Sequence, residues 1–181
     1  MQINTELLEQ INNWLEQDPD SVTHLKLTQL VNAANNGDGA ALIELQDAFR
    51  APLEFGTAGL RGALGPGPNR MNRVTVLQAI GGFVEYLKEK GFSGQKVVIG
   101  YDARYNSDVF AKDSAEVLAG NGFIPVLFDH VVPTPVLAFA IRDLKTCAGI
   151  MVTASHNPPQ DNGYKVYLGD GRQIVPPADQ E

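Results

Sequence analysis

The sequence predicts a fold of the α/β class with three layers (α/β/α) and an N-terminal helical extension. Helices are expected to cover both faces of a mostly parallel mixed sheet. Two observations indicate this fold. From residue 51 onward, short apolar runs of β type alternate with stretches of helical period, which is typical of βαβ units. The first fifty residues carry helical patterns only. We therefore expect a helical extension over residues 1–50 and a main domain over residues 51–181.

The N-terminal extension carries three helical patterns. Apolar residues recur every four positions from Ile3 to Leu15, as in an amphipathic helix, and Asp18-Pro19 marks its end. Two further helices are expected around 26–34 and 39–49, separated by the breaker Asn-Asn-Gly-Asp-Gly.

The main domain is expected to open with a strand at the start of LEFGTAGLRG that runs into a glycine-rich loop. Helical spacing follows from Leu77 to Leu87 and ends at Lys90-Gly91. KVVIGYD then has the composition of a short buried strand, and Asn106 or Ser107 is placed to cap the next helix.

The second half of the main domain continues the alternation. FIPVLFD predicts another strand, although Pro125 argues against a central place in the sheet. A helix is expected from Leu137 to Leu144, and the β-type run AGIMVTA leads directly into a turn that contains Ser155. YKVYL and QIV predict two short strands after that turn.

Ligands of open parallel sheets bind beyond the carboxyl ends of the strands. Three loops follow predicted strands and are therefore candidate sites: GTAGLRGALGPG, YDARYNS and SHNPPQDNG.

Composition excludes several classes of protein. Asp and Glu number 21 and Lys and Arg 14, so the net charge is -7, which argues against nucleic acid as the main partner. The single cysteine, Cys147, excludes an intramolecular disulfide. No apolar run reaches membrane-spanning length, and MQINTELLEQ does not resemble a signal peptide. We therefore expect a cytoplasmic protein that binds neither nucleic acid nor membrane.

The loop SHNPPQDNG has three interpretations. Its Asn, Pro, Asp and Gly residues suit a surface turn, but a turn gives no reason for Ser155, His156 and Lys165. A hydrolase nucleophile requires a base oriented by a third group, and the sequence is not the G-x-S-x-G elbow of α/β-hydrolases. A phosphoserine fits better, because Lys165 returns on the next strand and is available to neutralise a phosphoryl charge or to carry a proton.

Three segments in order identify a family. Thr153-Ala-Ser-His-Asn-Pro158, with Lys165 behind it, resembles the phosphoserine loop of the α-D-phosphohexomutases, the phosphoglucomutases and phosphomannomutases. FGTAGLRG (55–62) is similar to the arginine loop of that family, and GYDAR (100–104) to its Gly-x-Asp-x-Arg segment. Together they cover most of residues 51–175, and FGTAGLRGALGPGPNRMN resembles the longer phosphoglucomutase branch, which includes phosphopentomutases.

The resemblance implies a role for each matching residue. Ser155 would carry the phosphoryl group, transfer it to a sugar monophosphate and recover it from the other end of the bisphosphate. His156 would position the sugar, and Lys165 would act as general acid or base. Arg61 would stabilise the transferring phosphate and contact the substrate. Arg104 would contact the substrate or form a structural pair with Asp102; the sequence leaves both open.

The resemblance also implies a Mg²⁺ ion, with the Ser155 phosphate as one ligand, and glucose 1,6-bisphosphate as activator and intermediate. The metal-binding Asp-Gly-Asp-Gly-Asp-Arg segment of the family is absent, and Asp170 supplies the one carboxylate of the nearest run. We therefore expect the other metal ligands, and the sites for the sugar and its distal phosphate, in missing domains of the same polypeptide. The chain would then be a truncated first domain without mutase turnover of its own.

The expected function is thus that of the first domain of a phosphoglucomutase-like isomerase, which interconverts glucose 1-phosphate and glucose 6-phosphate. Phosphomannomutase and phosphopentomutase are alternatives within the family. A non-catalytic phosphosugar-binding module is the alternative from another class.

Overall fold

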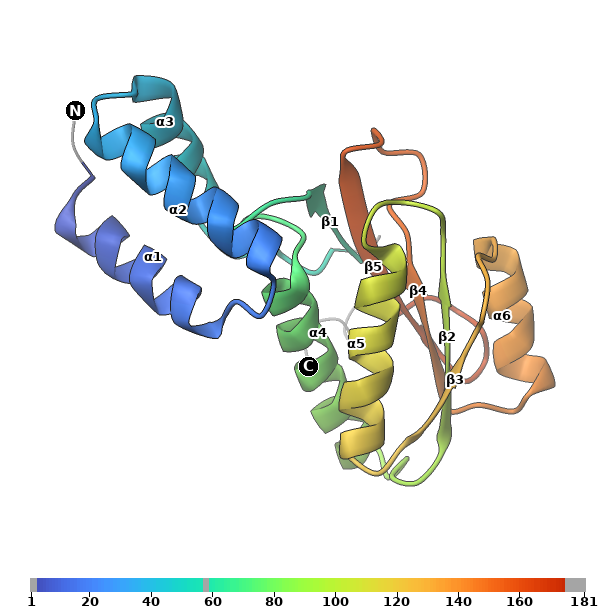
Figure 1. Ribbon diagram of the computed structural model, residues 1–181. Coiled ribbons are helices and arrows are strands. Elements are labelled where there is room, and N and C mark those ends of the chain that lie inside the picture. Colours follow the sequence, from blue (N-terminus) through green and yellow to red (C-terminus); the bar gives the residue numbers. More distant parts are fainter. Residues whose placement is uncertain (1–2, 57–58, 175–181) are drawn as a thin grey trace. The chain divides into compact units, whose positions relative to one another are not determined.

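The computed structural model describes residues 3–56 and 59–174 (Figure 1). The chain forms two compact units. The first consists of Met1–Leu53 and Gly62–Thr75, and the second of Glu54–Arg61 and Val76–Glu181. The first unit is thus larger than the helical segment expected over residues 1–50, and that boundary stays a prediction. None of the helices in the described ranges is long and apolar enough to span a membrane.

The first unit contains the three expected helices, α1 (Thr5–Gln17), α2 (Ser21–Asn35) and α3 (Gly39–Ala48). Asn4, Asp20 and Asp38 cap them, because each side chain accepts a hydrogen bond from a backbone N–H of the first turn. The cap at Asp20 explains why α2 starts earlier than its apolar pattern suggests.

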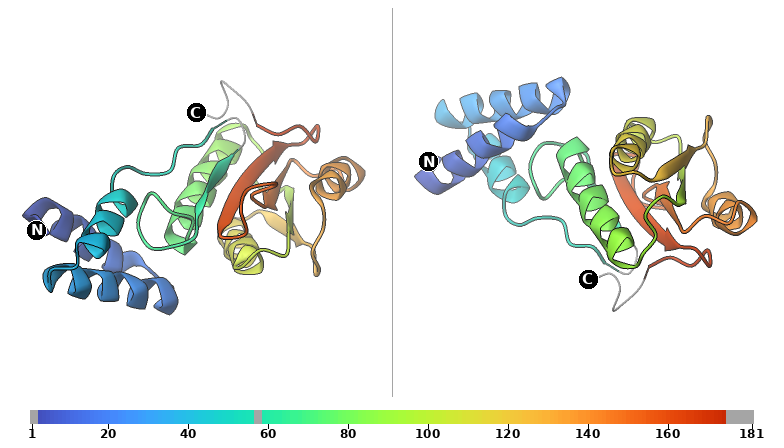
Figure 2. Two further views of the ribbon diagram at one scale, coloured as in Figure 1. Left: turned by 90° about the horizontal axis from the view of Figure 1, so that it is seen from above. Right: turned by 90° about the horizontal axis from the view of Figure 1, so that it is seen from below.

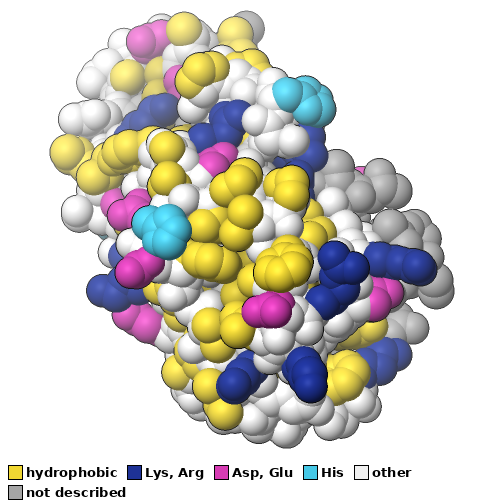
Figure 3. All heavy atoms as spheres, turned by 90° about the vertical axis from the view of Figure 1, so that its right-hand side faces the viewer, with side chains coloured by type: hydrophobic (Ala, Val, Ile, Leu, Met, Phe, Trp, Pro, Cys, Tyr) yellow, Lys and Arg dark blue, Asp and Glu magenta, His cyan; other side chains and the backbone are white. Residues whose placement is uncertain are grey.

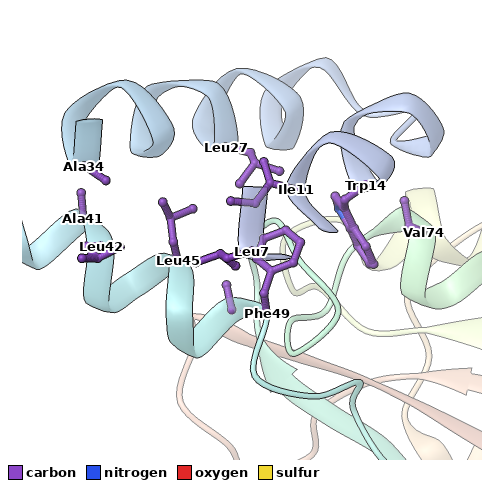
Figure 4. Packing of buried hydrophobic residues seen from close by; sticks show 11 residues of the cluster. Leu7, Ile11, Trp14, Leu27, Ala34, Ala41, Leu42, Leu45, Phe49 and Val74 are labelled. Carbon is purple, nitrogen blue, oxygen red and sulfur yellow. The ribbon is translucent and has the colours of Figure 1, made fainter. Parts of the chain in front are cut away.

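The core of the first unit lies between the helices (Figure 4). Leu7, Ile11 and Trp14 line one face of α1, which confirms the amphipathic pattern of that segment. The Trp14 ring meets the Phe49 ring edge-on, with 6.1 Å between their centroids. This cluster gives the helical segment a hydrophobic core of its own.

The segment after β1 (Leu60–Ala63) belongs mostly to the first unit and packs on α3. Arg70 forms an ion pair of 2.6 Å with Asp47, and the Asn72 side-chain amide donates to the carbonyls of Gly65 and Gly67 at 2.9 Å each. Helix α4 (Arg73–Glu89) begins in this unit and continues into the second.

The second unit is built on a five-stranded sheet with the order β1-β5-β4-β2-β3 (Figure 2). Its remaining strands are β2 (Lys96–Tyr101), β3 (Ile124–Leu127), β4 (Ala148–Val152) and β5 (Asp161–Leu168). Strand β2 runs parallel to β3 and β4, whereas β5 is antiparallel to β4. Strand β3 is an edge strand, which agrees with the expectation drawn from its proline.

Helices α5 (Ser107–Gly120) and α6 (Thr134–Asp143) cover the sheet (Figure 1). Leu137 and Ile141 of α6 pack on Val98 and Met151. Helix α5 packs on the opposite face, where its Ser114 meets Tyr164 of β5. The α/β fold with a mixed sheet between helices is therefore confirmed.

Apolar side chains are exposed on the face of the second unit that carries α6, where they gather into patches between charged residues (Figure 3). The exposed large apolar residues of α6 and of the segments that flank this helix comprise Val131, Val136, Phe139 and Leu144. The outer surface of α6 is therefore less polar than the pattern of an ordinary surface helix would require.

Two predicted strands differ from the structure. The strand expected at the start of LEFGTAGLRG lies at its end, because Gly56 and Gly59 exchange backbone hydrogen bonds and the chain pairs with β5 only after them. In QIV, Gln173 forms a single bridge with Tyr167 rather than a strand, and Val175 lies outside the described residues. YKVYL is the later part of the longer strand β5.

The start of α5 is also different from the expected cap. Asn106 occupies the cap position in a left-handed conformation and makes no side-chain cap bond. The Ser107 hydroxyl instead donates to the Asp102 carboxylate at 2.8 Å.

Candidate functional site

The Ser155 loop connects β4 to β5 and leaves the sheet at the carboxyl end of β4. Ser155 and His156 are both exposed. Ser155 adopts a left-handed conformation with φ 60°, which residues other than glycine rarely adopt. Its backbone N–H donates to the Thr153 hydroxyl at 2.9 Å. The loop thus presents the serine to solvent on a strained backbone.

Arg104 follows the parallel strand β2 and binds the Ser155 loop from the side. Its guanidinium donates to four loop carbonyls, those of Ser155 (3.1 Å), Asn157 (2.8 Å), Pro158 (2.7 Å) and Asp161 (2.9 Å). Its Nε lies 3.3 Å from the Asp102 carboxylate, so the pairing with Asp102 that the sequence left open is present.

Asp102 and Asn162 add hydrogen bonds within and between the loop after β2 and the loop after β4. The Asp102 carboxylate also accepts from the Arg104 backbone N–H at 3.0 Å. The Asn162 side chain is fully buried and donates to the Tyr105 carbonyl and to the Ser107 hydroxyl, each at 3.0 Å. The loops after β2 and β4 therefore form one hydrogen-bonded layer.

Arg61 reaches the site from β1, which lies beside β5. One guanidinium nitrogen is 3.4 Å from the Asn157 side-chain oxygen, whereas the buried Nε has no hydrogen-bond partner among the described residues. A buried N–H without an acceptor is uncommon and costs stability.

Two glycines allow β1 to approach β5. A Cβ at Gly163 would lie 2.7 Å from the carbonyl oxygens of both Leu60 and Thr153. Gly59 has φ 81°, and a Cβ there would overlap the Tyr164 carbonyl oxygen. Glycine at position 59 is thus required by the contact that places Arg61.

Lys165 lies on β5 opposite Met151 and is 6% exposed. Burial lowers the pKa of its amine, and the nearby Arg61 guanidinium lowers it further, against an opposing effect of Asp102. No carboxylate in the described ranges forms an ion pair with Lys165. A lysine of this kind gives up its proton more readily than an exposed one.

The described residues do not form a metal site by themselves. No three side chains of the His, Cys, Asp and Glu types are grouped in a way that would hold an ion. Asp102 and Asp161 already accept hydrogen bonds from Arg104 and Asn157, respectively. Asp170, the carboxylate noted in the sequence, lies in a turn where it accepts from the Arg172 backbone N–H at 2.9 Å. A Mg²⁺ ion would need ligands from elsewhere.

The structure brings several predicted residues to one edge of the sheet. Arg61 and Arg104 contact the Ser155 loop directly, and Lys165 lies near Arg61. His156 has no hydrogen bond to another described residue. Thr153 has a role that sequence reasoning missed: its hydroxyl two residues before Ser155 is the acceptor that holds the serine backbone.

The site thus consists of an exposed serine at the carboxyl edge of the sheet, with the half-buried Arg61 and the buried Lys165 near its loop. Residues 52–181 match the model of the domain family "Phosphoglucomutase/phosphomannomutase, alpha/beta/alpha domain I". The chain therefore belongs to the phosphoglucomutase/phosphomannomutase family and contains its domain I.

Individual relatives agree with this family. The chain is 43% identical to a "Probable phosphoribomutase" of Schizosaccharomyces pombe, with 96% of the chain and 29% of the relative covered. It is 45% identical to a "Phosphopentomutase" of Homo sapiens, with coverages of 92% and 28%. The crystal structure of a "putative phosphomannomutase from Thermus Thermophilus" superposes with a TM-score of 0.66 and 39% identity, over 72% of this chain and 29% of that one. The chain thus spans less than a third of the length of these relatives.

Proposed function

We propose that this chain is the phosphoserine-bearing domain of a sugar-phosphate mutase, with Ser155 as the phosphoryl carrier. The observation that supports this most directly is the placement of Ser155. It is exposed at the carboxyl edge of the sheet, on a loop that Arg61 contacts, while the cation Lys165 lies beneath on β5. An ordinary surface turn gives no reason for a buried lysine and a half-buried arginine at the same edge of the sheet.

The proposed step transfers one phosphoryl group. A sugar hydroxyl oxygen attacks the phosphorus of phosphoserine, a new P–O bond forms, and the bond between phosphorus and Ser155 Oγ breaks. The hydroxyl loses its proton to a base, and Oγ gains a proton as it leaves. In the second half-reaction, Ser155 takes the other phosphoryl group of the bisphosphate by the reverse step. Atoms and protons balance over the cycle.

The neighbouring side chains supply charge and protons. Arg61 stabilises the equatorial phosphate oxygens with its guanidinium, which reaches the Ser155 loop at Asn157. Lys165 moves the proton, because its lowered pKa raises the fraction of neutral amine near neutral pH. His156, exposed beside Ser155, positions the sugar. A contact between Arg104 and the substrate stays a prediction.

Mg²⁺ and glucose 1,6-bisphosphate are part of the proposal. The phosphate of Ser155 would supply one oxygen ligand, and the ion would neutralise charge on the transferring group. The described residues do not complete such a site, so its other ligands would come from further domains of the same polypeptide. We accordingly propose that the 181-residue chain alone has no mutase turnover.

The sugar is the open part of the proposal. The sequence favoured glucose phosphates, with mannose and pentose phosphates as alternatives. The names of two relatives that cover more than nine-tenths of the chain, a phosphoribomutase and a phosphopentomutase, favour a pentose phosphate, whereas another relative of similar coverage is named a glucose 1,6-bisphosphate synthase. We therefore propose ribose 1-phosphate and ribose 5-phosphate as the first substrate pair to test and glucose 1-phosphate and glucose 6-phosphate as the second.

The decisive experiment compares wild type with Ser155→Ala in the longest polypeptide that the reading frame encodes. Conversion of ribose and glucose 1-phosphates is followed by coupled assays with Mg²⁺ and a trace of glucose 1,6-bisphosphate. Loss of activity in Ser155→Ala, together with a phosphoryl mass on the wild-type peptide that contains Ser155, is expected. Activity that survives the substitution would remove Ser155 from the mechanism.

The same variant distinguishes the other interpretations. A phosphosugar-binding module would show no turnover with either serine or alanine, yet both would bind sugar phosphates with equal affinity. A hydrolase would react at Ser155 with a fluorophosphonate probe, whereas a phosphoryl carrier without a paired base is expected to remain unlabelled. The predicted cytoplasmic location is a separate matter and stays a prediction.

A further inference from the structure

The guanidinium of Arg104 is fully used within the protein. An arginine has five N–H donors. In Arg104 one points to the Asp102 carboxylate and the others to the carbonyls of Ser155, Asn157, Pro158 and Asp161. No N–H of this guanidinium is left for a substrate phosphate.

These contacts surround the strained residue. Ser155 has a positive φ, which its side chain disfavours, so other contacts must hold it in this conformation. Its carbonyl accepts from Arg104, and its N–H donates to the Thr153 hydroxyl. The peptide groups on both sides of the Ser155 Cα are therefore fixed by hydrogen bonds.

We propose that Arg104 and Thr153 are positioning residues that hold Ser155 in its left-handed conformation and aim its hydroxyl away from the sheet. The inference rests on the proposed function of Ser155 as phosphoryl carrier. It assigns Arg104 to the loop and not to the substrate. A misplaced serine would lose its alignment with the attacking hydroxyl, even though substrate binding itself is unchanged.

The chain contains a matched control for Arg104. Arg172 stands two residues after Asp170, as Arg104 stands after Asp102. Its backbone N–H donates to the Asp170 carboxylate at 2.9 Å, and its Nε lies 3.7 Å from it. Its side chain is 88% exposed and forms no hydrogen bond or ion pair with the Ser155 loop in the described part of the chain. Arg172→Ala thus removes an arginine from the same local motif without touching the carrier.

The first test measures the Ser155 backbone by NMR in the isotope-labelled chain. A positive φ places the amide proton close to Hα and produces a strong intraresidue NOE. We expect this NOE in wild type, Arg172→Ala and Thr153→Ser, and its loss in Arg104→Ala and Thr153→Val. Its persistence in both of the latter variants would overturn the proposal. If Arg104→Ala unfolds, the comparison of Thr153→Val with Thr153→Ser decides in the same way.

The second test separates positioning from substrate binding in the longest polypeptide that the reading frame encodes. We expect Arg104→Lys to lower kcat about 100-fold while KM stays within about threefold of wild type, since misalignment by an ångström has effects of that size. A raised KM with unchanged kcat would instead assign Arg104 to the substrate. The NMR experiment does not depend on the role of Ser155 as phosphoryl carrier. A failure of the proposed function can therefore be distinguished from a failure of the proposed positioning role of Arg104 and Thr153.

Discussion

Arg61 and Lys165 place two positive charges near each other at the edge of the sheet, and the guanidinium lowers the pKa of the amine in addition to the larger effect of burial. Neither forms an ion pair with a carboxylate of the described residues. Like charges without a counter-ion destabilise a fold unless an anion joins them. Their juxtaposition is therefore a cost to stability, which the phosphate of the proposed function would offset.

The cost of charging Lys165 predicts a pH-dependent stability. The folded-state pKa lies below the ordinary value, so the folded chain loses this proton before the unfolded chain does. The destabilisation is complete below the folded-state pKa and disappears as pH rises toward about 10.4, the unfolded value. Lys165→Met should therefore raise the free energy of unfolding at neutral pH, by at most about 1 kcal/mol for each pKa unit of lowering, since solvent screens part of the effect.

Urea unfolding at several pH values checks this expectation. The difference between Lys165→Met and wild type should shrink as pH increases above neutral. Lys112→Met is the control, because the Lys112 side chain is 72% exposed. A difference that grows with pH would contradict the assigned direction of the pKa shift.

The Arg61 guanidinium, which forms no ion pair with a carboxylate of the described residues, predicts a gain in stability on anion binding. Sulfate at about ten times its dissociation constant would stabilise the fold by about 1.4 kcal/mol. Arg61→Met should lose this increment. Thermal unfolding in sodium sulfate and in sodium chloride of equal ionic strength measures it, with Arg172→Met as the control for the general effect of sulfate on proteins. An equal increment in both variants would exclude Arg61 as an anion ligand.

The close approach of β1 and β5 predicts that alanine at Gly163 destabilises the fold, whereas alanine at the helical Gly82 stabilises it. Gly163→Ala would press its methyl group against two carbonyl oxygens at 2.7 Å, and backbone atoms cannot turn aside as side chains do. We expect a loss of about 2–3 kcal/mol. Gly82 lies in α4, and no atom is within 4 Å of the position that a Cβ would take there, so Gly82→Ala should gain up to about 1 kcal/mol. Calorimetry that shows equal effects would refute the contact.

Much of the fold follows from local patterns in the sequence. The three helices of the first unit were predicted from their apolar and breaker patterns, although the Asp20 cap that starts α2 at Ser21 was not, and Pro125 correctly marks an edge strand. Strand β1 was harder to locate, because its pairing with β5 depends on partners about a hundred residues away. Nothing within LEFGTAGLRG shows where that pairing starts.

The sequence predicted which residues belong to the site, but it did not predict the contacts that these residues make. The motifs identified Ser155, Arg61 and Lys165 as a group, and the structure places them at one edge of the sheet. The four backbone carbonyls that Arg104 binds cannot be identified from the sequence, because every residue has a backbone carbonyl. The sequence therefore showed which arginine to consider but not what it binds.

The buried pair Tyr164 and Ser114 predicts an asymmetric response to substitution. Ser114 has one hydroxyl proton and donates it to the Phe110 carbonyl at 2.8 Å. The Tyr164 hydroxyl, 2.7 Å away, must then be the donor to Ser114, in keeping with its pKa, which burial raises well above the ordinary value. Tyr164→Phe leaves Ser114 with a partner and should cost about 1 kcal/mol.

Ser114→Ala instead leaves the fully buried Tyr164 hydroxyl without its acceptor, which costs about 1–3 kcal/mol. Adding Tyr164→Phe to Ser114→Ala removes the unsatisfied group, so the double variant should be more stable than Ser114→Ala alone. Urea unfolding of the four proteins in this cycle measures the coupling. Strictly additive losses would mean that the two hydroxyls do not depend on each other, and the assignment of Tyr164 as donor would then be wrong.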